Sequence, residues 1–200
     1  MTFPAPSLNL PPMKTILLPL LLAALVLPVR AADKAKPAAK ATATFYITEV
    51  KCSSCASSID ESLRKLPSVT KIDDLSENTG FAVITFDPAV VSHHQLAQAV
   101  FAAAPVHGDP YVATLKFTIA DYAKGDNAAK VDAVIAKHKS NVRIELKNKA
   151  KGEFLLSFEP LRVDGAKKGP QGWTLESFRS AIQEPAPNGL GLTLAVKSEN

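Results

Sequence analysis

The two cysteines of the chain stand three residues apart, as Cys52 and Cys55, within the tetrapeptide Cys-Ser-Ser-Cys. A strand-like alternation precedes them and a helical pattern follows them. In a loop that enters a helix, both sulfurs can turn toward one point, and the helix N-terminus favours thiolate. Thiolates are soft ligands that select Cu(I) and related ions. The spacing therefore indicates metal or redox chemistry, and the alternative is a plain disulfide within the loop.

The residues around the thiols predict the elements that position them. Residues 43–48 alternate with period two, as a half-buried strand does, and apolar residues from Ala56 to Leu66 recur at helical spacing until Pro67. Residues 69–72 and 81–86 are predicted strands joined by a hairpin, and Ser92 is predicted to cap a second helix that Pro105 ends. The predicted order is βαββα, with another strand to follow.

In this register the segment from Thr44 to Ala104 resembles the heavy-metal-associated domain family, of the copper-chaperone and mercuric-ion-binding type. The resemblance implies a ferredoxin-like α+β fold and a soft metal ion, Cu(I) or Hg(II), held between the two thiolates, with no catalytic residue. The family usually has Gly-Met where this chain has Glu49 and Val50, and Val50 can still fill the core beneath the loop. The motifs that carry the resemblance are the Cys-x-x-Cys loop, Ile59 and Leu63, Leu66-Pro67-Ser68-Val69, Phe86-Asp87-Pro88, and Leu96 with Val100.

The N-terminus predicts export. The pattern of a secretory signal peptide covers residues 1–31, with Lys14, the apolar run 16–27 and small residues around Ala31, and Met13 is the expected true start. The apolar run is short and broken by proline, so no membrane span is expected in the mature protein. Residues 32–42, rich in Ala, Lys and Pro, are predicted to be a flexible leader. The predicted location is periplasmic or secreted.

The second half of the chain repeats the pattern of the first. Ile59 and Val131, Leu63 and Ile135, Ile84 and Leu156, and Phe86 and Phe158 are related by one constant offset. The predicted fold class is therefore α+β, with tandem ferredoxin-like βαββαβ domains and antiparallel sheets, at residues 43–110 and 111–200. The segment Tyr111 to Ile119 could supply the fourth strand of the first domain or the first strand of the second. The loop from Leu161 to Trp173 is the main insertion.

The second copy has no thiols. Asp121 and Asp126 lie in the loop that corresponds to the cysteine loop, where turn and helix-capping roles compete with binding of a hard ion such as calcium. This copy is predicted to be a scaffold or an interaction module that binds no soft metal.

The four histidines have different predicted roles. His107 follows the second helix and should lie at the cysteine end of the fold, where imidazole could be a third ligand. His93 and His94 should lie at the other end, as polar residues in the first turn of a helix. His138 is expected to interact with the last carbonyls of its helix.

The remaining patterns limit the classes of function. The sequence has no phosphate-binding glycine loop and no serine-histidine-aspartate motif, so we expect no enzyme. A thioredoxin-type oxidoreductase is the rival use of Cys-x-x-Cys, but that class usually has a Gly-Pro-like interior where this chain has Ser53-Ser54. No nucleic-acid partner is expected. The prediction is an exported protein that binds or delivers Cu(I), with Hg(II) carriage or a disulfide-containing interaction module as alternatives. Its expected partners are the metal ion and a metal-transporting membrane protein or another metal-binding domain.

Overall fold

The computed structural model describes residues 40–162 and 168–199. The predicted signal peptide and most of the predicted leader lie outside the described residues. No helix within the described part of the chain is both long enough and apolar enough to cross a membrane. The elements in chain order are β1 (Ala41–Ile47), α1 (Ser53–Arg64), β2 (Lys71–Asp73), β3 (Phe81–Phe86), α2 (His93–Ala102), β4 (Ala113–Ile119), α3 (Asn127–His138), β5 (Val142–Asn148), β6 (Glu153–Phe158), α4 (Leu175–Gln183) and β7 (Leu194–Val196).

The first half has the strand order β4-β1-β3-β2, with antiparallel pairing. Its order βαββαβ is that of a ferredoxin-like fold. Alternate residues of β1 point into the core, with Phe45 fully buried, while Ile59 of α1 and Val100 of α2 pack against the same core. Strand β1 begins at Ala41 and so takes in the last two residues of the predicted leader.

The second half repeats this arrangement, with the strand order β7-β4-β6-β5. Its core combines aliphatic side chains with several aromatic rings. Phe117 of β4 stacks on Phe154 of β6 with ring centroids 5.2 Å apart, and Phe178 of α4 meets Phe117 edge-on at 5.5 Å. Strand β7 is short and begins at Leu194. The tandem α+β fold predicted from the sequence is confirmed.

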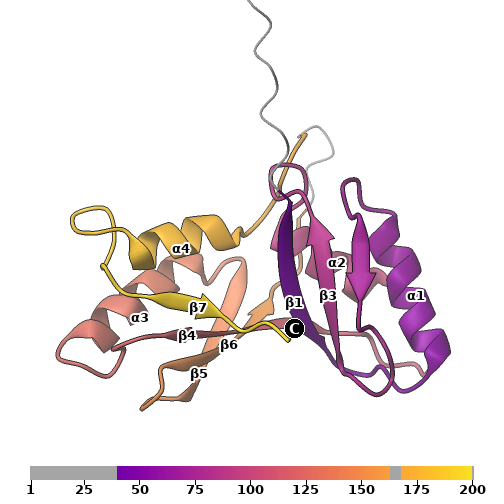
Figure 1. Cartoon of the computed structure of the whole chain (residues 1–200), viewed down its shortest axis with the longest axis horizontal. Coiled ribbons are helices and arrows are strands. Elements are labelled where there is room, and N and C mark those ends of the chain that lie inside the picture. Colours follow the sequence, from indigo (N-terminus) through magenta and orange to yellow (C-terminus); the bar gives the residue numbers. More distant parts are fainter. Residues whose placement is uncertain (1–39, 163–167, 200) are drawn as a thin grey trace, which may run out of the picture. The chain divides into compact units, whose positions relative to one another are not determined.

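Strand β4 belongs to both halves, and all seven strands form a single sheet (Figure 1). Thr114 pairs with Tyr46 of β1 and with Ser157 of β6, whereas residues 117–119 pair with β7. The segment Tyr111 to Ile119, which the sequence allowed either domain to contain, therefore belongs to the sheets of both halves. Strands β1 and β7 follow one another along the same edge of β4.

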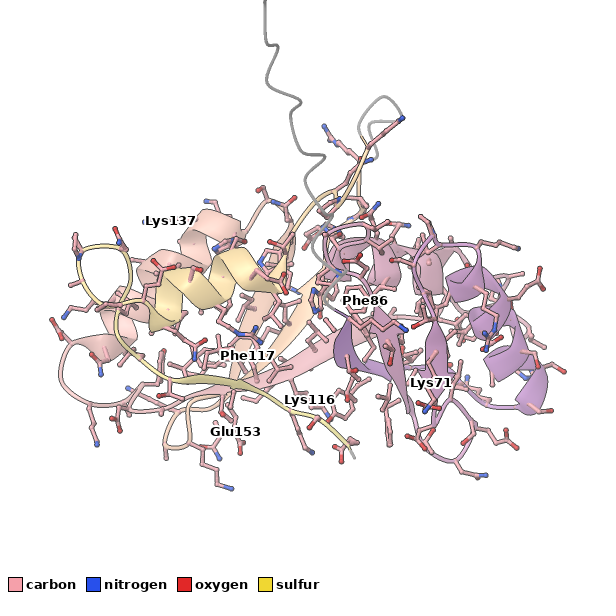
Figure 2. The ribbon with its side chains drawn as sticks, turned by 45° about the horizontal axis from the view of Figure 1, so that its top comes forward. Lys71, Phe86, Lys116, Phe117, Lys137 and Glu153 are labelled. Carbon is pink, nitrogen blue, oxygen red and sulfur yellow. The ribbon has the colours of Figure 1, made fainter. Side chains whose placement is uncertain are left out.

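Polar contacts connect the two halves on the face of the sheet opposite to the buried Phe117. Lys116 and Phe117 are neighbours on β4 (Figure 2), but Phe117 is buried, whereas Lys116 places its Nζ 3.5 Å from the centre of the Tyr46 ring. The Tyr46 hydroxyl donates a hydrogen bond of 2.6 Å to Glu199, just after β7. Burial and this contact with Glu199 raise the pKa of Tyr46 to about 12. The end of the described chain is thus attached to β1.

The start of α2 is a buried junction between the halves, which differs from the polar first turn predicted for His93 and His94. Both side chains are at most 3% exposed. The His93 ring lies edge-on to Phe86, at 5.1 Å, and near Trp173 of the second half, at 6.2 Å. His94 Nδ1 accepts a hydrogen bond of 3.2 Å from the Trp173 backbone N–H, and His94 Nε2 lies 2.6 Å from the Glu159 carbonyl oxygen.

Gly172 permits this close approach. Its φ is +75°, and a Cβ added there would lie 2.5 Å from His94 Nδ1. The end of the predicted insertion loop is therefore a packed segment that covers α2.

Candidate metal centre

The two thiols lie at the N-terminus of α1. Cys52 is the N-cap residue, in an extended conformation, and its Sγ accepts a hydrogen bond of 3.3 Å from the Cys55 backbone N–H. The two sulfur atoms are 2.9 Å apart and both cysteines are free thiols. Cys55 is fully buried, whereas Cys52 is partly exposed. The helix start therefore directs both sulfurs to one point and leaves one of them accessible.

The backbone that leads into the thiols has an unusual conformation. Glu49 has a φ of +67°, in the left-handed region where glycine has no steric penalty. This explains why glycine is usual at this position in proteins that the segment resembles. Val50, the next residue, is buried beneath the loop, as the sequence indicates. The loop is tied to β4 because the Thr48 N–H donates to the Val112 carbonyl oxygen at 3.0 Å.

The pKa of the Cys55 thiol lies below its ordinary value. Burial acts to raise this pKa, but hydrogen bonds with Cys52 and with the Tyr111 hydroxyl, together with backbone hydrogen bonds at the loop, lower it further than burial raises it. A lowered pKa increases the thiolate fraction at neutral pH, and thiolate is the form that binds a soft metal ion.

Tyr111 also lies at the site, although the sequence pattern indicates only that it begins a strand. Its side chain is 1% exposed, and its hydroxyl also accepts a hydrogen bond of 3.1 Å from the Val106 N–H. The tyrosine thus connects the thiol loop to the loop after α2. The sequence predicts a strand that begins after Pro110. It does not predict that Tyr111 lies beside Cys55, because that position depends on the pairing of β4 with β1.

His107 lies at the thiols, where the sequence predicted it. Within the described ranges, the only group of three metal-ligating side chains is Cys52, Cys55 and His107, whose ligand atoms all lie within 4.8 Å of one another. The histidine is exposed, so its ring can turn toward an ion. The site therefore offers two sulfur donors and one nitrogen donor.

The candidate oxygen ligands of the second half are held in ion pairs. Asp121 pairs with Lys124 at 2.7 Å and Asp126 with Lys130 at 3.0 Å. The predicted capping role is wrong for Asp126, because it is the N-cap residue of α3 but its side chain makes no capping hydrogen bond and pairs with Lys130 instead. His138, at the end of α3, packs its ring edge-on against Phe178 at 5.3 Å, a contact that periodicity alone did not indicate.

A βαββαβ unit with a thiol pair at the start of its first helix defines a class of soft-metal-binding domain, and the comparisons with known proteins agree. Residues 44–104 match the heavy-metal-associated domain family. The mercuric transport protein periplasmic components of Pseudomonas fluorescens and of Alcaligenes sp are each 37% identical over 87 residues, which is 44% of this chain and 87% of each relative. The chain therefore belongs to the heavy-metal-associated domain family.

Two solved structures also align with the chain. The water-soluble region of the P-type ATPase CopA from Bacillus subtilis covers 80% of this chain and 93% of its own, with 16% identity and a TM-score of 0.36. A solution structure of the N-terminal soluble domains of Bacillus subtilis CopA gives 15% identity and a TM-score of 0.34 over 80% of this chain. The family match ends at residue 104.

Proposed function

We propose that this protein is an exported carrier of a soft metal ion, which it binds between Cys52 and Cys55 and delivers to another protein. The ion proposed first is Cu(I). The observation that carries the proposal is the thiol pair at the N-terminus of α1, with a lowered pKa at Cys55. The ion is cargo, so the protein contributes binding and exchange rather than catalysis.

The unequal exposure of the two sulfurs fits a carrier. Cys55 is buried and would retain its bond to the ion, whereas Cys52 is partly exposed and can be reached by a thiol of a receiving protein. Exchange of one thiolate at a time would move the ion without releasing it to solvent. A metal-transporting membrane protein or another metal-binding domain would be the receiver.

Hg(II) is the alternative cargo, because it also accepts two thiolates. Both curated relatives are named as mercuric transport components, and this favours Hg(II). Their names also contain the word periplasmic, which supports the location predicted from the signal-peptide pattern.

The second half would act as a scaffold for the site. It fixes β4, and the residues just before β4 contact the thiol loop through Tyr111 and Val112. An interaction module with a structural disulfide is the competing interpretation, and it requires that reduced protein take up no metal.

A competition titration of reduced protein tests the proposal. Cu(I) and Hg(II) are each titrated against a chelator of known affinity, with the wild type and with the double variant Cys52→Ser/Cys55→Ser. We expect stoichiometric binding by the wild type and none by the variant, and the ratio of the two affinities identifies the cargo. Undiminished binding by the serine variant, or no uptake by reduced wild type, would refute the proposal.

A further inference from the structure

The thiol site has a third donor whose position is set by its own loop. His107 lies between two proline residues, Pro105 and Pro110, in the segment that connects α2 to β4. Its ligating nitrogen lies within 4.8 Å of both sulfurs. Two ligands of a single ion are separated by at most about 4.6 Å, since metal-nitrogen and metal-sulfur bonds measure roughly 2.0 to 2.3 Å. The three ligand atoms are therefore near enough that a small turn of the exposed imidazole would let them share one ion.

Two hydrogen bonds hold this loop against the thiol end of the fold. The Ser58 hydroxyl of α1 donates to the Ala104 carbonyl oxygen at 2.8 Å, before the histidine. The Val106 N–H donates to the buried Tyr111 hydroxyl at 3.1 Å, and so closes the loop on itself. After the histidine, the exposed Asp109 side chain lies 4.0 Å from the exposed Lys51 side chain, and such a pair contributes little to holding the loop. The loop that carries His107 is thus held by hydrogen bonds at Ala104 and Val106, while the imidazole stays exposed and able to turn.

We propose that His107 is a third ligand that binds Cu(I) together with Cys52 and Cys55, and that this nitrogen distinguishes Cu(I) from Hg(II). The inference rests on the proposed function of the thiol pair. Cu(I) readily accepts a third donor, and imidazole is a suitable ligand for copper. Hg(II) bound by two thiolates forms a linear unit that gains little from a third donor. The histidine would therefore strengthen binding of Cu(I) and leave binding of Hg(II) nearly unchanged.

The exposure of His107 also suits transfer. Displacement of a surface imidazole by an incoming thiol opens a coordination position without breaking a bond to sulfur. The buried Cys55 would remain bound throughout this step. His107 would thus retain the ion during transport and be the first ligand to leave.

The test compares His107→Ala with a matched variant of the same loop, Asp109→Ala. Asp109 is exposed, and its side chain lacks a nitrogen donor. Cu(I) and Hg(II) affinities are measured for both variants and the wild type by chelator competition, and X-ray absorption at the copper edge reports a nitrogen ligand directly. We expect His107→Ala to weaken Cu(I) binding by about tenfold or more, because loss even of a group that only hydrogen-bonds to a metal ligand typically costs that much. Hg(II) binding should change less than about threefold, and the copper-nitrogen signal should disappear.

The outcomes separate this inference from the proposed function. If His107→Ala binds Cu(I) as tightly as the wild type while Cys52→Ser/Cys55→Ser binds none, the third ligand is refuted and the thiol site stands. An equal loss of Cu(I) affinity in Asp109→Ala would also refute it, since the loop and not the imidazole would then matter. If the wild type binds neither ion, the proposed function itself fails.

Discussion

The two βαββαβ units share a backbone frame, but only the first presents thiols. Glu49 and Asp121 occupy equivalent positions and both have left-handed φ angles, of 67° and 59°. Each is followed by a buried side chain that fills the core, Val50 in the first unit and Tyr122 in the second. The entry to the loop is therefore the same in both copies, although their sequences there differ.

The copies diverge at the start of the next helix. In the first, α1 begins directly after Cys52, which caps it with its sulfur. In the second, the position equivalent to Cys52 is Lys124, and α3 begins only after Asp126, whose side chain makes no capping hydrogen bond. The second copy lacks both the ligands and the early helix start that presents them. The core residues thus determine the βαββαβ fold, and a few loop residues determine whether a thiol site is present.

The largest expected effect comes from separating the two units. A chain that ends at Pro110 loses the buried Tyr111 and all of β4, so we expect it to lose cooperative unfolding. A chain that ends at Ile119 keeps both and should retain more of the native structure. Circular dichroism and urea unfolding measure this difference. If the chain that ends at Pro110 unfolded cooperatively at the same urea concentration as the whole protein, the conclusion that the first unit needs β4 would be wrong.

A smaller effect is expected at the junction, where His93 is buried between the units. Burial, and then the charge of Arg179, lower the pKa of His93 from 6.5 to about 4. The unfolded chain therefore binds a proton below about pH 6.5 that the folded chain binds only near pH 4. The free energy of unfolding therefore has its full His93 contribution above pH 6.5. As the pH falls to 4, this contribution decreases by about 3 kcal/mol.

Replacement of this histidine by phenylalanine tests the assignment. Within the described ranges His93 Nδ1 has no hydrogen-bond partner, so His93→Phe keeps the ring packing and removes a buried polar atom that is already unpaired. We expect near wild-type unfolding free energy at pH 7 and a flatter decline toward pH 4. His94→Phe is the control, because it removes two hydrogen bonds and should destabilise the protein at every pH. Parallel pH profiles of the wild type and His93→Phe would contradict the assignment.

The smallest effect concerns the two left-handed residues. Glu49→Gly relieves a left-handed conformation but loses the ion pair with Lys51, so we expect a net gain of up to about 1 kcal/mol in unfolding free energy. Asp121→Gly should gain less, because aspartate tolerates this conformation better. Glu49→Ala keeps the strain and loses the pair, so it should not stabilise the protein. A gain for alanine equal to that for glycine would show that the φ angle is not the cause.

The sequence predicted the helices, strands and core residues well, because hydrophobic periodicity is a local signal. Phe45, Ile59 and Val100 were placed on their strand and helices by spacing alone, and they form the core. His107 was placed at the cysteine end because the order of elements determines which loops share an end of the sheet. Its distance from the sulfurs needed the structure.

The features that the sequence did not predict depend on contacts between the two halves. The burial of His93 and His94 results from Trp173, which lies far along the chain in a segment that had the composition of a loop. The place of Tyr111 beside Cys55 depends on the register of β4 against β1. Neither contact leaves a periodic signal in the sequence.

The central claim is that the loop of the first unit, and not the mere presence of two thiols, makes the soft-metal site. Its most direct test moves the thiols to the second unit by combining Cys52→Ser and Cys55→Ser with Lys124→Cys and Asn127→Cys. Cu(I) bound per chain is then measured in the presence of a competing chelator, beside the reduced wild type. We predict that the wild type retains one Cu(I) and that the rearranged protein loses it to the chelator. Equal retention by both proteins would contradict the account.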